Sequence, residues 1–233
     1  MSRDSRRFRD RPEAGRLLAE AIAEKGYADP VVLALPRGGI PIAIQVARAL
    51  AAPMDLILVR KIGVPSQPEL AAGAIVDGGE PETIYNDDVI AMTGLTRDRV
   101  DELGKRQLEE IERRRALYLK DRPAVSVAGR TAIVVDDGIA TGATARAALH
   151  AMRRKQARKV VLAVPVGPSD TLASFAGEAD EVICLSEPAP FYAIGIHYLD
   201  FRQLDDDDVI ELMAEADRLT GDETGPSGTD ANS

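Results

Sequence analysis

Cysteine and aromatic residues are scarce in this chain of 233 residues, and basic residues are outnumbered by acidic ones. The single cysteine, Cys184, cannot form an intramolecular disulfide, and its place in the apolar run EVICL predicts a buried thiol in a cytoplasmic protein. The 29 basic and 38 acidic residues give a net charge of −9, which argues against a general nucleic-acid or membrane surface. We find no export signal and no membrane span in the sequence, and we expect a soluble protein.

The length and the 45% hydrophobic content are sufficient for one sizeable core, so we expect one domain with at most a small appended subdomain. This domain is predicted to cover residues 13–219. Residues 1–12 are rich in Arg and Asp and are either a mobile arm or an N-terminal segment that packs against the domain. The segment 220–233 contains no large apolar residue, and it is predicted to be disordered.

Continuous apolar runs alternate with helical segments along the chain. The predicted strands cover residues 31–36, 54–61, 131–137, 159–166 and 180–185. The predicted helices cover residues 13–25, 40–51, 96–120, 143–155, 169–176 and 207–219. Runs without polar alternation are typical of strands that are buried on both faces. The alternation predicts an α/β fold with a Rossmann-like parallel sheet flanked by helices, in which ligands bind beyond the carboxyl ends of the strands.

One such strand end is followed by the stretch VVDDGIATGAT, residues 134–144. Gly138 and Gly142 permit unusual backbone conformations, and the small Ala140 and Ala143 let a ligand approach the main chain. Successive amides at a helix N-terminus form an anion site, to which the hydroxyls of the two threonines would add donors. These threonines are Thr141 and Thr144. The loop is therefore predicted to bind phosphate; the alternative is an N-capping turn beside two solvated acids.

The adjacent acids Asp136 and Asp137 precede this loop, where they would repel a phosphate unless they serve another part of the ligand. Sugar hydroxyls or a bound Mg²⁺ would suit carboxylates. A ribose 5-phosphate combines a diol with a phosphate and would fit both features.

These residues resemble the phosphoribosyl-pyrophosphate signature of the type I phosphoribosyltransferases, in particular of stand-alone bacterial proteins whose acceptor is undecided. The resemblance implies that Asp136 and Asp137 hold the ribose 2- and 3-hydroxyls. It also implies a cradle for the 5-phosphate, made of Gly138, Ile139, Ala140, Thr141, Gly142, Ala143 and Thr144. A small hood, with elements from residues 1–30 and 187–205, is implied beside the sheet.

Two further segments extend the resemblance over about residues 30–200. LPRGGIP, residues 35–41, is similar to the family's pyrophosphate loop, in which Arg37, Gly38 and Gly39 would bind pyrophosphate; the alternative is a Pro-Gly turn before a helix. LVRKIGVPSQPELAAGAI, residues 58–75, resembles the strand end and flexible loop that carry cations to the pyrophosphate. Arg60 and Lys61 would take that role, unless they are ordinary charges at a strand end.

The resemblance implies a transferase that moves the phosphoribosyl group from phosphoribosyl pyrophosphate to a nitrogenous base. Arg37, Lys61 and Asp137 are the implied catalytic residues, Mg²⁺ is the implied cofactor, and the implied assembly is a homodimer. The magnesium would be carried by the substrate, with Asp136 and Asp137 as its candidate protein ligands. A loop at residues 63–72 would close over the site and exclude water.

The acceptor base is left open by the sequence. The 6-oxopurine enzymes of the family carry an acid at the position of Ala140. With alanine at this position, the loop instead resembles those of the adenine-type and uracil-type enzymes. Phe191 and Tyr192, in the aromatic segment 187–201, could stack on a heterocycle, although such aromatics also serve packing. His197, in the same segment, is a poor metal ligand because no second ligand is near it in the sequence.

Two other functions fit parts of the pattern. A regulator could keep the same fold and bind phosphoribosyl pyrophosphate or a nucleotide without turnover. A phosphatase could use Asp136 as nucleophile, but the acids lack the one-residue spacing common in such hydrolases. Arg37 and Lys61 favour the transferase, because a sensor would not need to neutralise pyrophosphate.

Overall fold

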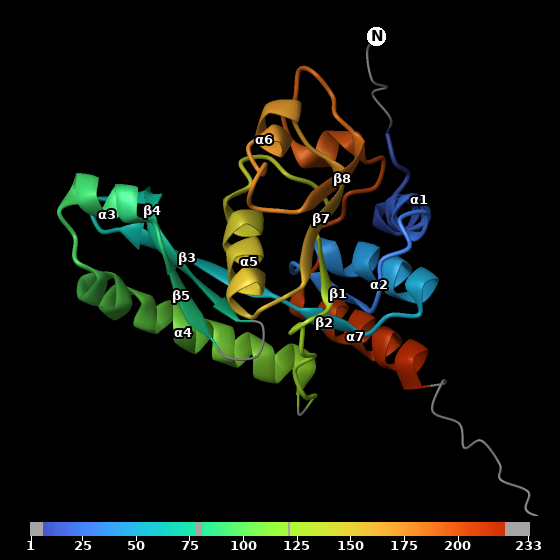
Figure 1. Ribbon diagram of the computed structural model, residues 1–233, viewed down its shortest axis with the longest axis horizontal. Coiled ribbons are helices and arrows are strands. Elements are labelled where there is room, and N and C mark those ends of the chain that lie inside the picture. The colour runs from blue at the N-terminus through green and yellow to red at the C-terminus, as the bar shows by residue number, and fades with distance from the viewer. Residues whose placement is uncertain (1–6, 78–80, 121, 222–233) are drawn as a thin grey trace, which may run out of the picture.

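The computed structural model describes residues 7–77, 81–120 and 122–221. Five parallel strands form the central sheet, in the order β2-β1-β6-β7-β8. These strands are β2 (Met54–Leu56), β1 (Pro30–Ala34), β6 (Thr131–Val135), β7 (Lys159–Val166) and β8 (Glu181–Ser186). The predicted parallel sheet is confirmed, and helices cover both of its faces (Figure 1).

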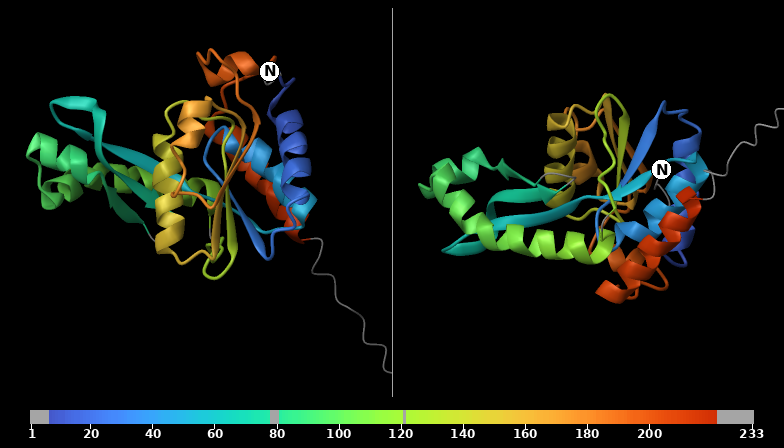
Figure 2. Two further views of the ribbon diagram at one scale, coloured as in Figure 1. Left: turned by 45° about the horizontal axis from the view of Figure 1, so that its top comes forward. Right: turned by 90° about the horizontal axis from the view of Figure 1, so that it is seen from below.

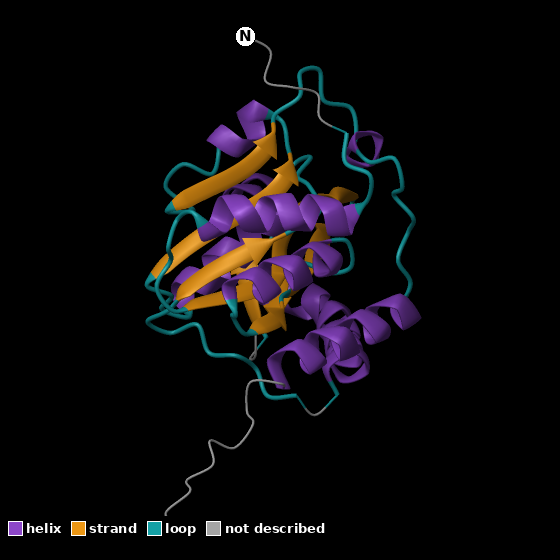
Figure 3. Cartoon of the chain, turned by 90° about the vertical axis from the view of Figure 1, so that its right-hand side faces the viewer, coloured by secondary structure: helices purple, strands orange, loops and turns teal. Residues whose placement is uncertain are grey.

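Alternate residues of each strand point to opposite faces, so the apolar runs supply two cores. On one face, Ile133 packs in a cluster with α1 (Arg11–Ala23), α2 (Gly39–Leu50) and α7 (Asp206–Gly221). Figure 3 views the molecule from that side and shows helices lying across the strands. On the other face, Val134 packs in a cluster with α5 (Ala143–Arg154) and the short α6 (Ser169–Ala173).

The register of β1 and β6 places their ends level with each other. Ala34 pairs with Val135, and the amide of Leu35 still donates to the carbonyl of Val135 at 2.9 Å. The loops that follow these two strands therefore start side by side at the carboxyl edge of the sheet. This arrangement brings together the two segments that were predicted to bind phosphate and pyrophosphate.

A second, antiparallel sheet extends from the core as an arm, in the strand order β3-β4-β5 (Figure 2). Its strands are β3 (Leu58–Val64), β4 (Gln67–Asp77) and β5 (Glu82–Tyr85), and its helices are α3 (Asp87–Thr93) and α4 (Arg97–Leu119). The sequence predicted a single strand at residues 54–61. That prediction was wrong because the chain leaves the parallel sheet at Ile57, whose amide makes the last bond to β1, at Ala34.

The expected loop at residues 63–72 is instead the end of a β-hairpin. Its turn lies between Val64 and Gln67, and a register irregularity occurs at Gly63. The segment was difficult to identify as strand because prolines and a glycine interrupt it, and the buried run that follows has no polar alternation.

Residues 7–10 are bonded to the segment after β8. The amide of Phe8 donates to the carbonyl of His197, and the amide of Leu199 donates to the carbonyl of Phe8, both at 2.8 Å. Phe8 is fully buried, so this part of the N-terminal segment is packed against the domain. Residues 1–6 of the expected arm and 222–233 of the expected tail lie outside the described residues, and the proposed domain and hood limits stay a prediction.

Cys184 is half-buried on β8 rather than fully buried, and its thiol donates to the carbonyl of Ser186 at 3.2 Å. Burial raises the pKa of this thiol to about 11, so it is largely protonated at neutral pH. Among the described residues, no helix combines the length and the apolar character needed to cross a membrane.

Candidate functional site

The loop between β6 and α5 presents a row of unengaged amides. Among the described residues, the amides of 140–145 donate no hydrogen bond, and Ala140 and Thr141 are exposed. Gly142 adopts a left-handed conformation, with φ of +75°, and a Cβ there would lie 2.6 Å from the ring of buried Phe175. The backbone is therefore curled tightly at the N-terminus of α5, where its amides can bind an anion.

The first part of the predicted phosphate cradle is used for anchoring. Ile139 is buried, and its amide donates to the carbonyl of Val166 at 2.9 Å. On the far side of the loop, the Thr171 hydroxyl donates to the carbonyl of Ala140 at 3.0 Å. The loop is thus held at both ends, and the amides from Ala140 onward are the ones left for a ligand.

The acid pair lies next to this loop, and its two carboxylates differ. Asp137 is buried, while Asp136 is half-buried and its Oδ1 accepts a bond from the Asp137 amide at 2.8 Å. Burial raises the pKa of both carboxyl groups. The charge of Asp137 raises the pKa of Asp136 further, whereas Arg11 opposes the rise at Asp137.

Arg11 is the residue that the sequence reasoning missed. Its Nε and Nη2 both lie 2.8 Å from Asp137 Oδ2, and both side chains are almost completely buried. Its Nη1 donates to the carbonyl of Arg202 at 2.8 Å, and its guanidinium lies over the ring of Phe201 at 3.9 Å. Nothing in the sequence around Arg11 identifies this role, because its partner is 126 positions away.

The predicted pyrophosphate loop meets the acid pair directly. A Cβ on Gly38 would lie 1.9 Å from Asp137 Oδ2, so only glycine fits there without movement. Arg37 donates through Nη1 to the carbonyl of Leu204 and pairs through Nη2 with Asp206 Oδ1, both at 2.8 Å. Gly39 is the first residue of α2. The motifs around residues 37 and 137 therefore form one site.

A cavity of about 610 Å³ opens at this junction. The lining residues come from both ends of the chain and from the arm, and they are Arg11, Arg37, Gly38, Arg114, Phe201, Gln203 and Leu204. Three guanidinium groups thus line a cavity in a protein with a net charge of −9, which supports local capture of an anion.

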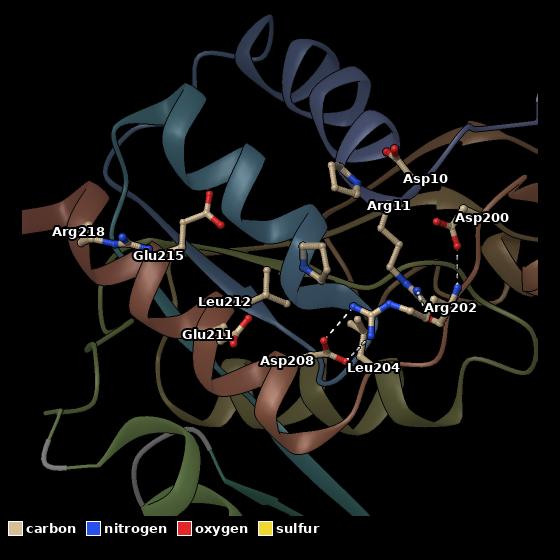
Figure 4. A pocket seen from close by; sticks show the side chains of 12 residues that line it. Asp10, Arg11, Asp200, Arg202, Leu204, Asp208, Glu211, Leu212, Glu215 and Arg218 are labelled. Carbon is tan, nitrogen blue, oxygen red and sulfur yellow. Dashed lines mark hydrogen bonds and ion pairs between the residues drawn. The ribbon is translucent and has the colours of Figure 1, made fainter.

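A second cavity, of about 480 Å³, is also lined by Arg11 and Leu204 (Figure 4). Figure 4 shows Arg11 reaching from α1 toward Arg202, which is paired with Asp208 at 2.7 Å. Acidic side chains dominate this cavity, so it does not suit the same anionic ligand. The acids are Asp10, Asp200, Asp208, Glu211 and Glu215.

Arg60 and Lys61 are neighbours on β3 and therefore point to opposite faces. Arg60 Nη2 pairs with Glu110 Oε1 of α4 at 3.0 Å. Lys61 is exposed and lines a different cavity, of about 330 Å³, together with Ala143 and Arg146 of α5. The structure does not bring Lys61 into the cavity of Arg37, and its role at pyrophosphate stays a prediction.

The candidate acceptor segment borders the phosphate loop. Ile194 lies against Gly138, where a Cβ would be 2.7 Å from Ile194 Cγ2. Phe191 stacks on the ring of His197, with centroids 5.4 Å apart, whereas Tyr192 is 78% exposed and open to a ligand. His197 is buried, and burial lowers its pKa. Phe191 is thus partly committed to packing.

Tyr198 fixes the acid pair from the same segment. Its hydroxyl donates to the carbonyl of Asp137 at 2.6 Å, and burial raises the pKa of the phenol. His150 is exposed on α5, and its Nε2 lies 3.2 Å from Glu178. Within the ranges that the structure describes, no three His, Cys, Asp or Glu side chains gather into a group that could hold a metal.

Comparison with known proteins agrees with this geometry. Residues 11–176 match the family model of the phosphoribosyl transferase domain. A Mycobacterium tuberculosis protein, named only provisionally as a phosphoribosyl transferase, is 49% identical over 211 residues, which cover 91% of this chain and 47% of the relative. The chain therefore spans about half the length of the curated relatives it matches.

Solved structures show the same fold. The crystal structure of TT1426 from Thermus thermophilus is 41% identical, with a TM-score of 0.80, and the match covers 90% of this chain and 98% of that one. A hypothetical protein from Neisseria gonorrhoeae with bound ppGpp shares the fold alone, at 14% identity and a TM-score of 0.50, over 96% of this chain and 99% of that one. The chain belongs to the phosphoribosyl transferase domain family.

Proposed function

We propose that the domain transfers the 5-phosphoribosyl group from phosphoribosyl pyrophosphate to a nitrogenous base, or catalyses the reverse reaction. The observation that carries this proposal is the row of unengaged amides at 140–145 beside the acid pair, in the described part of the chain. A ribose 5-phosphate would place its phosphate on the amides and its diol at Asp136 and Asp137. The arginine-lined cavity would then receive the pyrophosphate.

In the proposed reaction, a ring nitrogen of the base attacks C1 of the ribose with inversion. The bond from C1 to the pyrophosphate oxygen breaks, and its electron pair leaves with the pyrophosphate. Positive charge develops on the ribose in the transition state. The loop and the acid pair would fix the orientation of the sugar, while Arg37 would stabilise the negative charge of the leaving group.

Magnesium fits the oxygen donors of this site. Mg²⁺ binds through one or two carboxylates together with substrate phosphates, and it retains several water molecules. Asp136 is the better placed ligand, because Asp137 Oδ2 already accepts two bonds from Arg11. When bound, the ion would neutralise charge on the pyrophosphate.

The hairpin residues complete the proposal. Arg60 is tied to Glu110 and Lys61 faces α5, so Lys61 would reach the pyrophosphate only after the β3–β4 hairpin moves toward the core. Ala140 supplies no acid at the exposed end of the loop, so the proton of the acceptor base must leave by another route.

The test is a screen of purines and pyrimidines for pyrophosphate release in the presence of phosphoribosyl pyrophosphate and Mg²⁺. We expect release with one base or a small group of bases. Asp136→Asn should lower kcat/KM by roughly tenfold or more, because hydrogen bonds to charged groups contribute roughly 1.5–3 kcal/mol. Asp98→Asn removes an exposed acid on α4 and is the matched control for charge.

Each alternative gives a different result. Binding of phosphoribosyl pyrophosphate without release of pyrophosphate for any base would favour the non-catalytic regulator. Release of inorganic phosphate that depends on Asp136 would favour the phosphatase. Donor binding unchanged in Asp136→Asn would contradict the assignment of the diol site.

A further inference from the structure

A third arginine faces the cavity that contains Arg37. Arg114 lies in the C-terminal half of α4. It therefore belongs to neither of the two predicted binding loops, which precede α2 and α5. Its side chain is 22% exposed and lines the cavity together with Arg37 and Gly38. The cavity therefore receives a positive charge from the arm as well as from the core.

One edge of the Arg114 guanidinium is anchored and the other is open. Its Nε donates to Glu110 Oε1, one helical turn earlier, at 2.6 Å. Among the described residues, its Nη1 and Nη2 donate no hydrogen bond, and the guanidinium also interacts electrostatically with Asp206. A planar guanidinium held at Nε presents these remaining N–H groups in a fixed direction, which suits a phosphate group that accepts two parallel bonds.

Glu110 holds this arrangement together. It accepts bonds from Arg60 on β3 at 3.0 Å and from Arg113 at 2.9 Å, in addition to Arg114. Its hydrogen bonds to Arg113 and Arg114 lower the pKa of Glu110 to about 2, so it is ionised near neutral pH. One carboxylate accepts bonds from three guanidinium groups, and Asp206, whose Oδ2 lies 3.9 Å from Arg113 Nη2, is a second acid beside them.

We propose that Arg114, which lines the same cavity as Arg37 and Gly38, binds the pyrophosphate group of phosphoribosyl pyrophosphate, and that Glu110 is its positioning residue. This inference rests on the proposed function. Pyrophosphate carries several negative charges, and Arg37 alone does not match them because it also pairs with Asp206. Two guanidinium groups would make the site selective for a diphosphate over a monophosphate.

The experiment compares two neighbouring arginines by calorimetric titration with three ligands. Arg114→Gln and Arg113→Gln each remove one charge, together with one bond to Glu110 from Arg114 and two from Arg113. Arg113 is exposed and is not among the residues that line the cavity, which makes its variant the matched control. The ligands are phosphoribosyl pyrophosphate with Mg²⁺, pyrophosphate with Mg²⁺, and ribose 5-phosphate.

We expect Arg114→Gln to weaken binding of phosphoribosyl pyrophosphate and of pyrophosphate by roughly tenfold or more. Binding of ribose 5-phosphate should be unchanged, and Arg113→Gln should match the parent protein for all three ligands. Glu110→Gln should weaken pyrophosphate binding less than Arg114→Gln, because the arginine is still present but less well fixed.

Other results overturn the inference. Unchanged pyrophosphate binding in Arg114→Gln would exclude direct contact, and equal losses in Arg113→Gln would show that only the overall charge matters. If the parent protein binds pyrophosphate through Arg114 but does not bind phosphoribosyl pyrophosphate, the proposed function fails while the anion site stands.

Discussion

Gly38 lies so close to the Asp137 carboxylate that there is no room for a side chain at position 38. A Cβ there would lie 1.9 Å from Oδ2 and 2.4 Å from Cγ. Gly38→Ala should therefore push the carboxylate away from Arg11, with an overpacking cost of about 1–3 kcal/mol and weaker donor binding. The measurements are urea unfolding and titration with phosphoribosyl pyrophosphate.

Gly129→Ala is the control for this prediction. Gly129 has a φ of +72°, and a Cβ added there would meet nothing within 4 Å, so the change costs about 1–2 kcal/mol of backbone strain only. It should lower stability without affecting donor binding. A Gly38→Ala variant that binds the donor like the parent protein would show that the contact can relax freely.

At the scale of elements, one carboxylate joins the end of α1 to the edge of the sheet. Glu181 on β8 accepts bonds from Tyr27 at 2.7 Å and Lys159 at 3.0 Å, and it pairs with Lys25 at 2.6 Å. The hydrogen bonds from Lys25, Tyr27 and Lys159 lower the pKa of Glu181 to about 2. The pKa of Glu181 is lower in the folded protein than in the unfolded chain. This group therefore stabilises the folded state at pH values above its unfolded pKa.

The stabilisation should disappear as the pH falls from about 5 to about 2. Glu181→Gln should therefore lower the free energy of unfolding near pH 7, and the difference from the parent protein should shrink on acidification. Denaturant unfolding at several pH values measures it, with the exposed Glu24→Gln as control. A difference that is the same at pH 7 and pH 3 would contradict the ion-pair explanation.

The arm shows why some elements could not be predicted. The long helix α4 was expected from its apolar spacing and observed within a residue at each end. The hairpin was not, because its strands lack a clear period and gain stability from pairing with each other and packing on α4. Gly104 of α4, for example, lies close to Ile62 and Ile75 of the hairpin.

For the whole molecule, the two cores share β6. Ile133 and Val134 are both fully buried but belong to clusters on opposite faces. Ile133→Ala should lower the free energy of unfolding by about 2–5 kcal/mol, because the rigid sheet cannot close the cavity. The change should shift the midpoint of denaturant unfolding followed by circular dichroism, and a loss below about 1 kcal/mol would show that the core repacks.

The net charge of −9 also acts on the whole molecule, and it does not determine what the site binds. Three arginines and no acidic residue line the cavity of about 610 Å³, and among the described residues the nearby loop adds amides that donate no hydrogen bond. An acidic protein can therefore hold an anion in one place. The homodimer that the family resemblance implies stays a prediction, for which light scattering is the measurement.

The sequence by itself determined the parallel sheet, the place of the glycine-containing loop at 138–144 and the nearness of the two motifs. These features follow from local chemistry, since apolar runs form buried strands, glycines allow a curled backbone, and parallel strands end at one edge. Only the tertiary structure decided that Arg11 neutralises Asp137, that Arg114 joins Arg37, and that Arg60 and Lys61 face apart. Those contacts join residues distant in the chain, and packing of whole elements decides them rather than any local pattern.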